Sequence, residues 1–96
     1  MEDIYLKIQA LAAKSDPLGN TLKIRLEEEV IYIDGIGDTN QVHREDLEAQ
    51  CTLITKTDHF RSLMSGSLNP MMAVMTGKLK IEGDMGIAMK LTRIIG

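Results

Sequence analysis

The sequence predicts a single α+β domain over residues 1–96, with one sheet of about five strands covered on one face by helices. The length of 96 residues allows one hydrophobic core and leaves no room for a second domain. Hydrophobic spacing follows the order helix, four strands, two short helices, strand, helix, which is typical of an α+β plan. This spacing leaves the order of the strands within the sheet open.

The first half of the chain contains one predicted helix and three predicted strands. Apolar residues at helical spacing predict an amphipathic helix over residues 2–14. Alternating polar and apolar residues predict a strand over residues 22–27, and Glu28-Glu29 is expected to turn the chain into the next strand. That strand, residues 30–34, begins with four consecutive apolar residues and is expected to be buried on both faces. Residues 41–44 predict a short polar edge strand.

A fourth strand and a short helix are predicted next. The alternation from Leu47 to Ile54 predicts a strand that turns Cys51 toward the core. Thr57 is expected to cap a short helix, because its hydroxyl can accept a hydrogen bond from a free N–H group of the first turn. Gly66 is expected to end this helix, since glycine readily adopts the left-handed conformation of a helix C-terminus.

Residues 64–91 contain two helix starts and one strand. Asn69 followed by Pro70 predicts a helix start, because asparagine caps free N–H groups and proline at the first helical position loses no hydrogen bond. Gly77 is expected to end this second short helix. The alternation in residues 78–82 then predicts a strand with one solvated and one buried face.

The last predicted helix starts after Asp84, a second N-cap candidate, and runs from Met85 to Gly96. Its core-facing stripe contains Ile87, Ala88, Leu91, Ile94 and Ile95. Met85 and Met89 widen the apolar arc beyond the roughly 100° that a helix lying on a sheet needs. The extra apolar surface is therefore expected to contact another helix, a partner chain or a bound apolar molecule.

The second half of the chain resembles the C-terminal signature of the sterol carrier protein 2 family, the non-specific lipid-transfer domains. The matching positions, in order, are Gly66, Leu68-Asn69-Pro70, Ala73-Val74-Met75, Gly77-Lys78-Leu79-Lys80-Ile81, Gly83-Asp84 and Ala88-Met89-Lys90-Leu91. The resemblance is specific over residues 57–95 and rests on pattern alone upstream. It implies a five-stranded sheet, helices over one face, and an apolar cavity between them that takes sterols, fatty acids or acyl chains. Val74 stands where the family often has phenylalanine, which bears on the width of that cavity.

Composition excludes several other functions. The 11 basic and 14 acidic residues give a net charge of -3, which argues against phosphate-dominated binding of nucleic acid and against strong attraction to anionic membranes. The acidic start and the absence of a long apolar run predict neither a secretory signal nor stable insertion into a membrane. The single Cys51 needs no oxidising compartment. A cytoplasmic location is the expectation, and no cofactor is expected.

The main functional prediction concerns methionine. Six of the seven methionines fall within residues 64–91, and their unbranched, polarizable side chains suit a wall that repacks around different apolar ligands. Composition alone favours the alternative that they fill the core, whereas the family resemblance favours a ligand cavity. The predicted cavity lining comprises Phe60, Leu63, Met64, Leu68, Met71, Met72, Val74, Met75, Leu79, Ile81, Met85 and Met89.

No catalytic or metal-binding residue is predicted. His43 is expected on a solvated charged edge and His59 in a structural or exposed position, because neither has a nucleophile in a recognisable pattern. Cys51 is interpreted as a small buried hydrophobe. A copper site built from thioethers is disfavoured, since no nearby Cys or His completes the ligand set. The cations Lys78, Lys80, Lys90 and Arg93 could hold a carboxylate at a pocket mouth, but a solvated face is favoured.

The predicted function is therefore a small, non-enzymatic carrier that sequesters or transfers a lipid or other apolar molecule. Two alternatives stay open. One is an interaction domain with a collapsed cavity, in which the apolar C-terminal helix forms a homodimer or a partner surface. The other is an accessory domain of an enzyme system that works on lipids.

Overall fold

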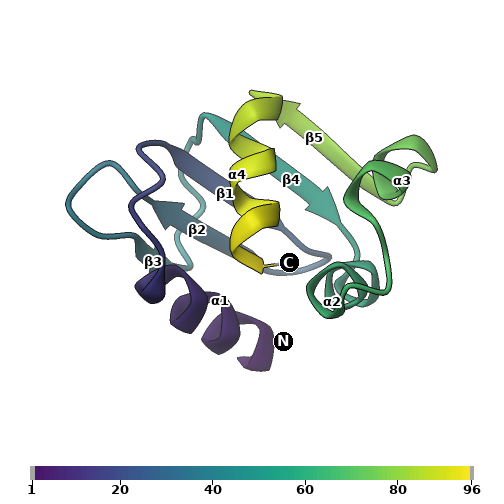
Figure 1. The fold of residues 1–96 in the computed structure, drawn as a ribbon, viewed down its shortest axis with the longest axis horizontal. Helices are drawn as coiled ribbons and strands as arrows, with labels where there is room; N and C mark the ends of the chain where they lie inside the picture. Colours follow the sequence, from purple (N-terminus) through teal and green to yellow (C-terminus); the bar gives the residue numbers. More distant parts are fainter. Residues whose placement is uncertain (1, 96) are drawn as a thin grey trace.

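The computed structural model describes residues 2–95 and has five strands in one sheet with four helices (Figure 1). The elements are α1 (Glu2–Lys14), β1 (Thr21–Arg25), β2 (Val30–Asp34), β3 (Gln41–His43), β4 (Cys51–Thr55), α2 (Thr57–Ser65), α3 (Pro70–Met75), β5 (Leu79–Gly83) and α4 (Met85–Ile95). The α+β class is confirmed. The expected extension of the last helix to Gly96 lies outside the described residues. Within residues 2–95, no helix combines the length and apolar character needed to cross a membrane.

The sheet is mixed and has the strand order β3-β2-β1-β4-β5. β1 is antiparallel to β2, with Leu22 opposite Ile33, and parallel to β4, with Leu22 also opposite Cys51. The two edge strands, β3 and β5, pair antiparallel with β2 and β4. β2, which follows β1 through a short turn, therefore lies on one side of β1. β4, which follows β3 through a longer connection, lies on the other side.

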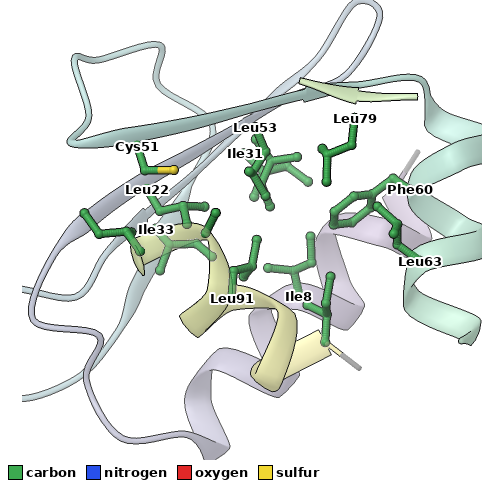
Figure 2. Close-up of a cluster of buried hydrophobic side chains, with 14 of the residues drawn as sticks. Ile8, Leu22, Ile31, Ile33, Cys51, Leu53, Phe60, Leu63, Leu79 and Leu91 are labelled. Atoms are coloured by element: carbon green, nitrogen blue, oxygen red, sulfur yellow. The ribbon is translucent and has the colours of Figure 1, made fainter. Parts of the chain in front are cut away.

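One face of the sheet carries the hydrophobic core. Because side chains alternate between faces along a strand, the buried aliphatic side chains of β1, β2, β4 and β5 share a face with Cys51. Together these residues are Leu22, Ile24, Ile31, Ile33, Cys51, Leu53 and Leu79. Figure 2 shows the sheet side chains on one side of the core and Ile8 of α1, Phe60 and Leu63 of α2, and Leu91 of α4 on the other. The sheet residues labelled there are Leu22, Ile31, Ile33, Cys51, Leu53 and Leu79. The expectation that helices cover one face is confirmed, as is the inward position of Cys51.

The opposite face is polar and is crossed by the segment between β3 and β4. Asp46 in this segment accepts hydrogen bonds from Lys23 Nζ at 2.8 Å and from Arg25 Nη2 at 3.1 Å. The Tyr32 hydroxyl donates to the backbone oxygen of Glu48 at 2.8 Å. Tyr32 is thereby buried, so that β2 is covered on both faces as its unbroken apolar run predicts.

The predicted bounds of the fourth strand are wrong at its N-terminal end. The strand expected over residues 47–54 starts only at Cys51, and Leu47 is 47% exposed. The alternation in residues 47–50 does not reflect strand pairing. Asp46 is hydrogen-bonded to Lys23 on the outer face of β1, so the residues that follow it still cross that face and join the sheet only at Cys51. The edge strands also differ slightly from their predicted bounds. β3 ends at His43, one residue earlier than predicted, and β5 runs from Leu79 to Gly83, one residue later than predicted.

A second correction concerns the start of α2. Lys56, and not Thr57, occupies the N-cap position, and its side chain makes no capping hydrogen bond. The carboxylate of Glu27 accepts a hydrogen bond from the Thr57 backbone N–H at 2.8 Å. This bond lowers the pKa of Glu27, since the charged form is the better acceptor. Glu27, thirty residues away in the sequence, therefore caps the first turn of α2 in place of the Thr57 hydroxyl.

Candidate functional site

A pocket of about 390 Å³ lies between the helices and the β4–β5 side of the sheet. Its lining comprises Leu53, Phe60, Leu63, Gly66, Leu68, Asn69, Pro70, Met71, Leu79, Met89, Thr92 and Ile95. Leu53 and Leu79 come from the sheet, and in Figure 2 Leu79 lies opposite Phe60 and Leu63 of α2. The remaining lining comes from α2, the connection between α2 and α3, the first two residues of α3, and α4. The lining is thus mainly aliphatic and aromatic, as in sites for apolar ligands.

The connection between α2 and α3 is fixed by local hydrogen bonds. Gly66 ends α2 in the left-handed conformation, with φ 82°, which glycine adopts without steric cost. The Leu68 backbone N–H donates to the Ser62 oxygen at 3.1 Å. The Asn69 side chain then caps α3, and Pro70 occupies its first turn. These features confirm the Asn-Pro helix start and the role of Gly66, and they hold the connection against the pocket.

α4 presents two different faces. Ile87 and Leu91 are 5% and 0% exposed and pack into the core. Met89, Thr92 and Ile95, spaced by three residues, lie on one side of the helix and line the pocket. Since α4 also contacts α1, part of its wide apolar arc is covered by another helix of the same chain.

The structure brings many of the predicted lining residues together. Phe60, Leu63, Leu68, Met71, Leu79 and Met89 line the pocket. Val74, Ile81 and Met85 line a small adjoining space of about 20 Å³, which shares Met71, Leu79 and Met89 with the pocket. That these residues contact a ligand stays a prediction.

Three predicted residues lie elsewhere. Met72 and Met75 on α3 are 52% and 77% exposed, because the short helix buries only Ala73 and turns these two side chains outward. Met64 lines a separate shallow space of about 160 Å³ beside Ile4 of α1. Methionine content does not specify how α2 and α3 are rotated about their axes, and this rotation decides which of their side chains face the pocket.

Several lining residues were missed by the sequence reasoning. Leu53 and Ile95 were assigned to strand and core positions, and Thr92 was not considered. The spacing of Thr92 and Ile95 from Met89 is a signal that could have found them, because residues three apart share a helix face. Asn69 and Pro70 were recognised only for their part in starting a helix.

The pocket has no charged lining among residues 2–95, and its polar side chains are Asn69 and Thr92. The cations weighed as carboxylate ligands lie outside this lining. Lys90 Nζ donates to the Leu18 backbone oxygen at 3.0 Å, and Lys80 Nζ lies 3.9 Å from a Glu82 carboxylate oxygen.

The other candidate residues have structural surroundings. His43 stacks on Tyr32, with 4.8 Å between ring centroids, and is therefore half-buried instead of fully solvated. Burial raises the pKa of the Cys51 thiol, which favours its inert, protonated form. Across residues 2–95 there is no group of three or more His, Cys, Asp or Glu residues arranged to hold a metal ion.

Comparison with known proteins places this architecture in a family. The family model described as the SCP-2 sterol transfer family matches residues 4–96. The chain belongs to this family. Sterol carrier protein 2 from Homo sapiens is 41% identical over 58 residues, covering 60% of this chain and 11% of that protein. Hydroxysteroid dehydrogenase-like protein 2 from Xenopus laevis is 36% identical over 67 residues, covering 68% of this chain and 16% of that protein.

Solved structures of the SCP-2 family share the fold. Sterol Carrier Protein-2 from Aedes aegypti, in complex with palmitate, aligns with a TM-score of 0.79 at 18% identity, covering 99% of this chain and 93% of that one. Sterol Carrier Protein 2 Like 2 from Aedes aegypti aligns with a TM-score of 0.78 at 22% identity, covering 98% and 94%. The five-stranded sheet with helices on one face is therefore the fold of this SCP-2 family.

Proposed function

We propose that this protein is a non-catalytic carrier that binds a lipid or similar apolar molecule reversibly in the pocket between β4, β5, α2 and α4. The ligand leaves water for an apolar wall, which is favourable by about 25 cal/mol per Å² of apolar surface buried. The observation that carries the proposal is the mainly apolar pocket of about 390 Å³. This volume lies within the range of about 300–1,000 Å³ that is usual for small-molecule sites.

Two further observations support the proposal. The chain belongs to the SCP-2 sterol transfer family, and a structural relative from Aedes aegypti holds palmitate. The pocket wall includes Met71 and Met89, whose flexible side chains can adapt to ligands of different shape. We place its action in the cytoplasm, a proposal with which a lone buried cysteine is compatible.

Displacement of a fluorescent fatty acid by unlabelled acyl chains, acyl thioesters and sterols tests this function. Saturable binding at micromolar concentrations is expected, because the pocket offers apolar area and few fixed polar groups. Bound ligand at about one hundred times its Kd should add about 2.7 kcal/mol to the free energy of unfolding. Absence of saturable binding by every ligand class would sink the proposal.

A second candidate function rests on the exposed methionines. Met71, Met72, Met75 and Met85 are each at least half exposed, and such apolar surface also suits an interface between two copies or with an enzyme of lipid metabolism. Native mass spectrometry separates the candidates. A co-purified lipid on a monomer favours the carrier, and a lipid-free dimer favours the interaction domain.

A further inference from the structure

The two edges of the sheet differ in how their backbone groups are occupied (Figure 1). β3 has three residues, and its Val42 backbone oxygen accepts a hydrogen bond from the Tyr5 hydroxyl of α1 at 3.1 Å. β5 has five residues, and in the described part of the chain the backbone of Leu79–Gly83 makes no hydrogen bond outside its ladder with β4. An edge strand points alternate N–H and C=O groups away from its sheet. β5 is therefore open to pairing with a further strand.

The charges along β5 and its flanks have a mirrored order. Lys78 and Lys80 precede Ile81, and Glu82 and Asp84 follow it at the same spacings. When two copies of this segment run antiparallel about Ile81, each lysine lies opposite an acidic residue of the other copy. A register centred on Lys80 or on Glu82 instead places two like charges directly opposite each other, which is destabilising. The sequence of β5 is thus complementary to itself in one register.

Lys80 and Glu82 are available for such pairs. Because Leu79 is buried on the core side of the sheet, alternation places Lys80 and Glu82 on the outer face. Their side chains are 70% and 58% exposed, and the 3.9 Å contact between Lys80 Nζ and Glu82 Oε2 is solvated and therefore weak. Residues directly opposite in an antiparallel pair bring their Cβ atoms to about 4.5–5.5 Å. Each lysine can therefore bind the acidic side chain of a second copy.

Ile81 gives this edge an apolar centre. Its side chain packs, partly buried, against the core on the helical face of the sheet. It also lines the small space of about 20 Å³ together with Met85, which is 50% exposed. In the register selected by the charges, Ile81 of one copy lies directly opposite Ile81 of the other, on the same face of the joined sheet. Aliphatic contact thus accompanies backbone pairing at the two-fold axis.

We propose that two copies of this chain form a dimer by antiparallel pairing of their β5 strands about Ile81. Backbone hydrogen bonds supply affinity, and the pairs between Lys80 and Glu82 fix the register. Assembly ends at two copies, because pairing occupies the β5 edge of both, whereas the β3 edge is short and contacted by α1. Lys80, Ile81 and Glu82 lie outside the lining of the pocket of about 390 Å³, so this inference is independent of the proposed carrier function.

Sedimentation velocity over a range of protein concentrations tests the dimer. The parent should shift from monomer to dimer as concentration rises, and added salt should favour the monomer because the charge pairs are exposed. Lys80→Glu and Glu82→Lys each put like charges opposite one another in both cross-strand pairs, so each should raise the Kd of the dimer about tenfold or more. The matched control Lys7→Glu makes the same change of charge at an exposed position of α1 and should dimerise as the parent does.

Mixing the two variants separates pairing from misfolding. The Lys80→Glu chain has only acidic side chains at these two positions, and the Glu82→Lys chain has only basic ones. An equimolar mixture should therefore form a heterodimer although each chain alone is mainly monomeric. The double variant Lys80→Glu/Glu82→Lys exchanges the charges and should dimerise again. A variant that had merely lost its fold would recover in neither experiment.

Cross-linking tests the register. Under mild oxidation, Ile81→Cys should form a disulfide between two copies, because directly opposite Cα atoms are about 4.5–5.5 Å apart in an antiparallel pair, within the range for a disulfide. Glu82→Cys is the control. Its counterpart in the second copy lies about 7 Å further along the strand, beyond the reach of a disulfide. The native Cys51 is buried and does not compete.

The outcomes separate this inference from the carrier function. A parent that stays monomeric at every concentration overturns the dimer, while displacement of the fluorescent fatty acid reports on the carrier function separately. A dimer that survives both charge reversals, or one that is lost only on Met75→Gln, overturns the assignment to β5. Equal cross-linking of Ile81→Cys and Glu82→Cys overturns the register. A dimer that each reversal weakens and their mixture restores supports the proposal, whether or not lipid binds.

Discussion

The two ends of the helical layer differ in how completely they bury their apolar side chains. At the α1 end, beside β3, Ile4, Ile8 and Ala12 are no more than 2% exposed. At the α3 end, beside β5, only Ala73 is fully buried, and Met75 is 77% exposed. Figure 1 shows α1 and α3 at opposite ends of the domain, with α4 between them. One end is packed as a scaffold, and the other keeps apolar surface beside the pocket.

This difference indicates that the elements that form the most tightly packed part of the core differ from those that carry exposed apolar surface beside the pocket. Buried aliphatic side chains at the α1 end stabilise the fold whether or not a ligand is present. The α3 end has fewer buried contacts and a pocket at its side, so that it can adapt to a ligand at little cost to the fold. Substitutions that are similar in chemistry should therefore have unequal effects at the two ends.

The largest expected difference comes from a pair of truncations. Ile8→Ala removes a side chain that is 0% exposed and should lower the free energy of unfolding by about 2–5 kcal/mol. The matched change at the other end, Met72→Ala, removes a side chain that is 52% exposed and should cost less than about 1 kcal/mol. Urea denaturation of both variants measures the difference. Equal losses would remove the distinction between scaffold and binding end.

A buried polar residue gives the next largest effect at the scaffold end. Asn40 Oδ1 accepts from the Leu18 backbone N–H at 2.9 Å, and Nδ2 donates to the backbone oxygens of Ala12 and Asp16 at 3.1 Å. Asn40→Ala leaves these groups without partners and should cost about 2–4 kcal/mol. Amide hydrogen exchange should show the loss at the C-terminal end of α1 and spare α3. Faster exchange across the whole domain would contradict the local role assigned to Asn40.

Local patterns predicted the scaffold better than they predicted the site. The start of α3 follows from Asn69 and Pro70 alone, because capping needs only neighbouring residues. The start of β4 was misplaced because the preceding segment is fixed by Asp46, whose partners Lys23 and Arg25 lie more than twenty residues away. Such contacts leave no periodic trace in the sequence.

The pocket lining depended on helix rotation, which composition does not report. Methionine content selected Met71 and Met89, which line the pocket, together with Met75, which is 77% exposed and lies outside its lining. Thr92 was missed because an apolar pattern gives no weight to a threonine. The family resemblance supplied the architecture, whereas the individual lining positions required the packing of α3 and α4.

A substitution at the pocket wall should separate affinity from stability. Met89→Gln retains length and places an amide against the hydrocarbon of the ligand, which should weaken binding by about 1–3 kcal/mol. Met89 is 37% exposed, so the amide can reach water in the empty protein and unfolding should change little. Displacement titration and urea denaturation measure the two quantities. The opposite result, a large loss of stability with unchanged affinity in the folded fraction, would make Met89 a core residue.

A smaller effect is expected on the outer face of α3. Met75→Gln should change the free energy of unfolding by less than about 0.5 kcal/mol, because its side chain is 77% exposed and lines neither apolar space near the sheet. Ligand affinity should also be unchanged, in contrast to Met89→Gln. Analytical ultracentrifugation adds a second readout. Loss of a dimer on this substitution would support the interaction domain in place of the carrier.

The smallest effect concerns the ion pair between Asp3 of α1, at the scaffold end, and Arg61 of the neighbouring helix α2. The Arg61 guanidinium holds the pKa of the Asp3 carboxyl well below its ordinary value of 3.8. Because the folded-state pKa is the lower one, the stabilisation is fully present above the ordinary value and is lost as the pH falls below it. Both side chains are mostly solvated, so the loss should be small and should shrink with added salt.

Asp3→Asn tests this ion pair, with Asp38→Asn as the matched control. Asp38 is an exposed carboxylate without a salt-bridge partner among residues 2–95. Urea midpoints at neutral pH should be lower for Asp3→Asn than for the parent, and the difference should shrink progressively as the pH falls below the ordinary pKa of 3.8. The control should follow the parent at every pH. If the parent and Asp3→Asn lose stability in parallel on acidification, the ion pair between α1 and α2 does not contribute to the free energy of unfolding.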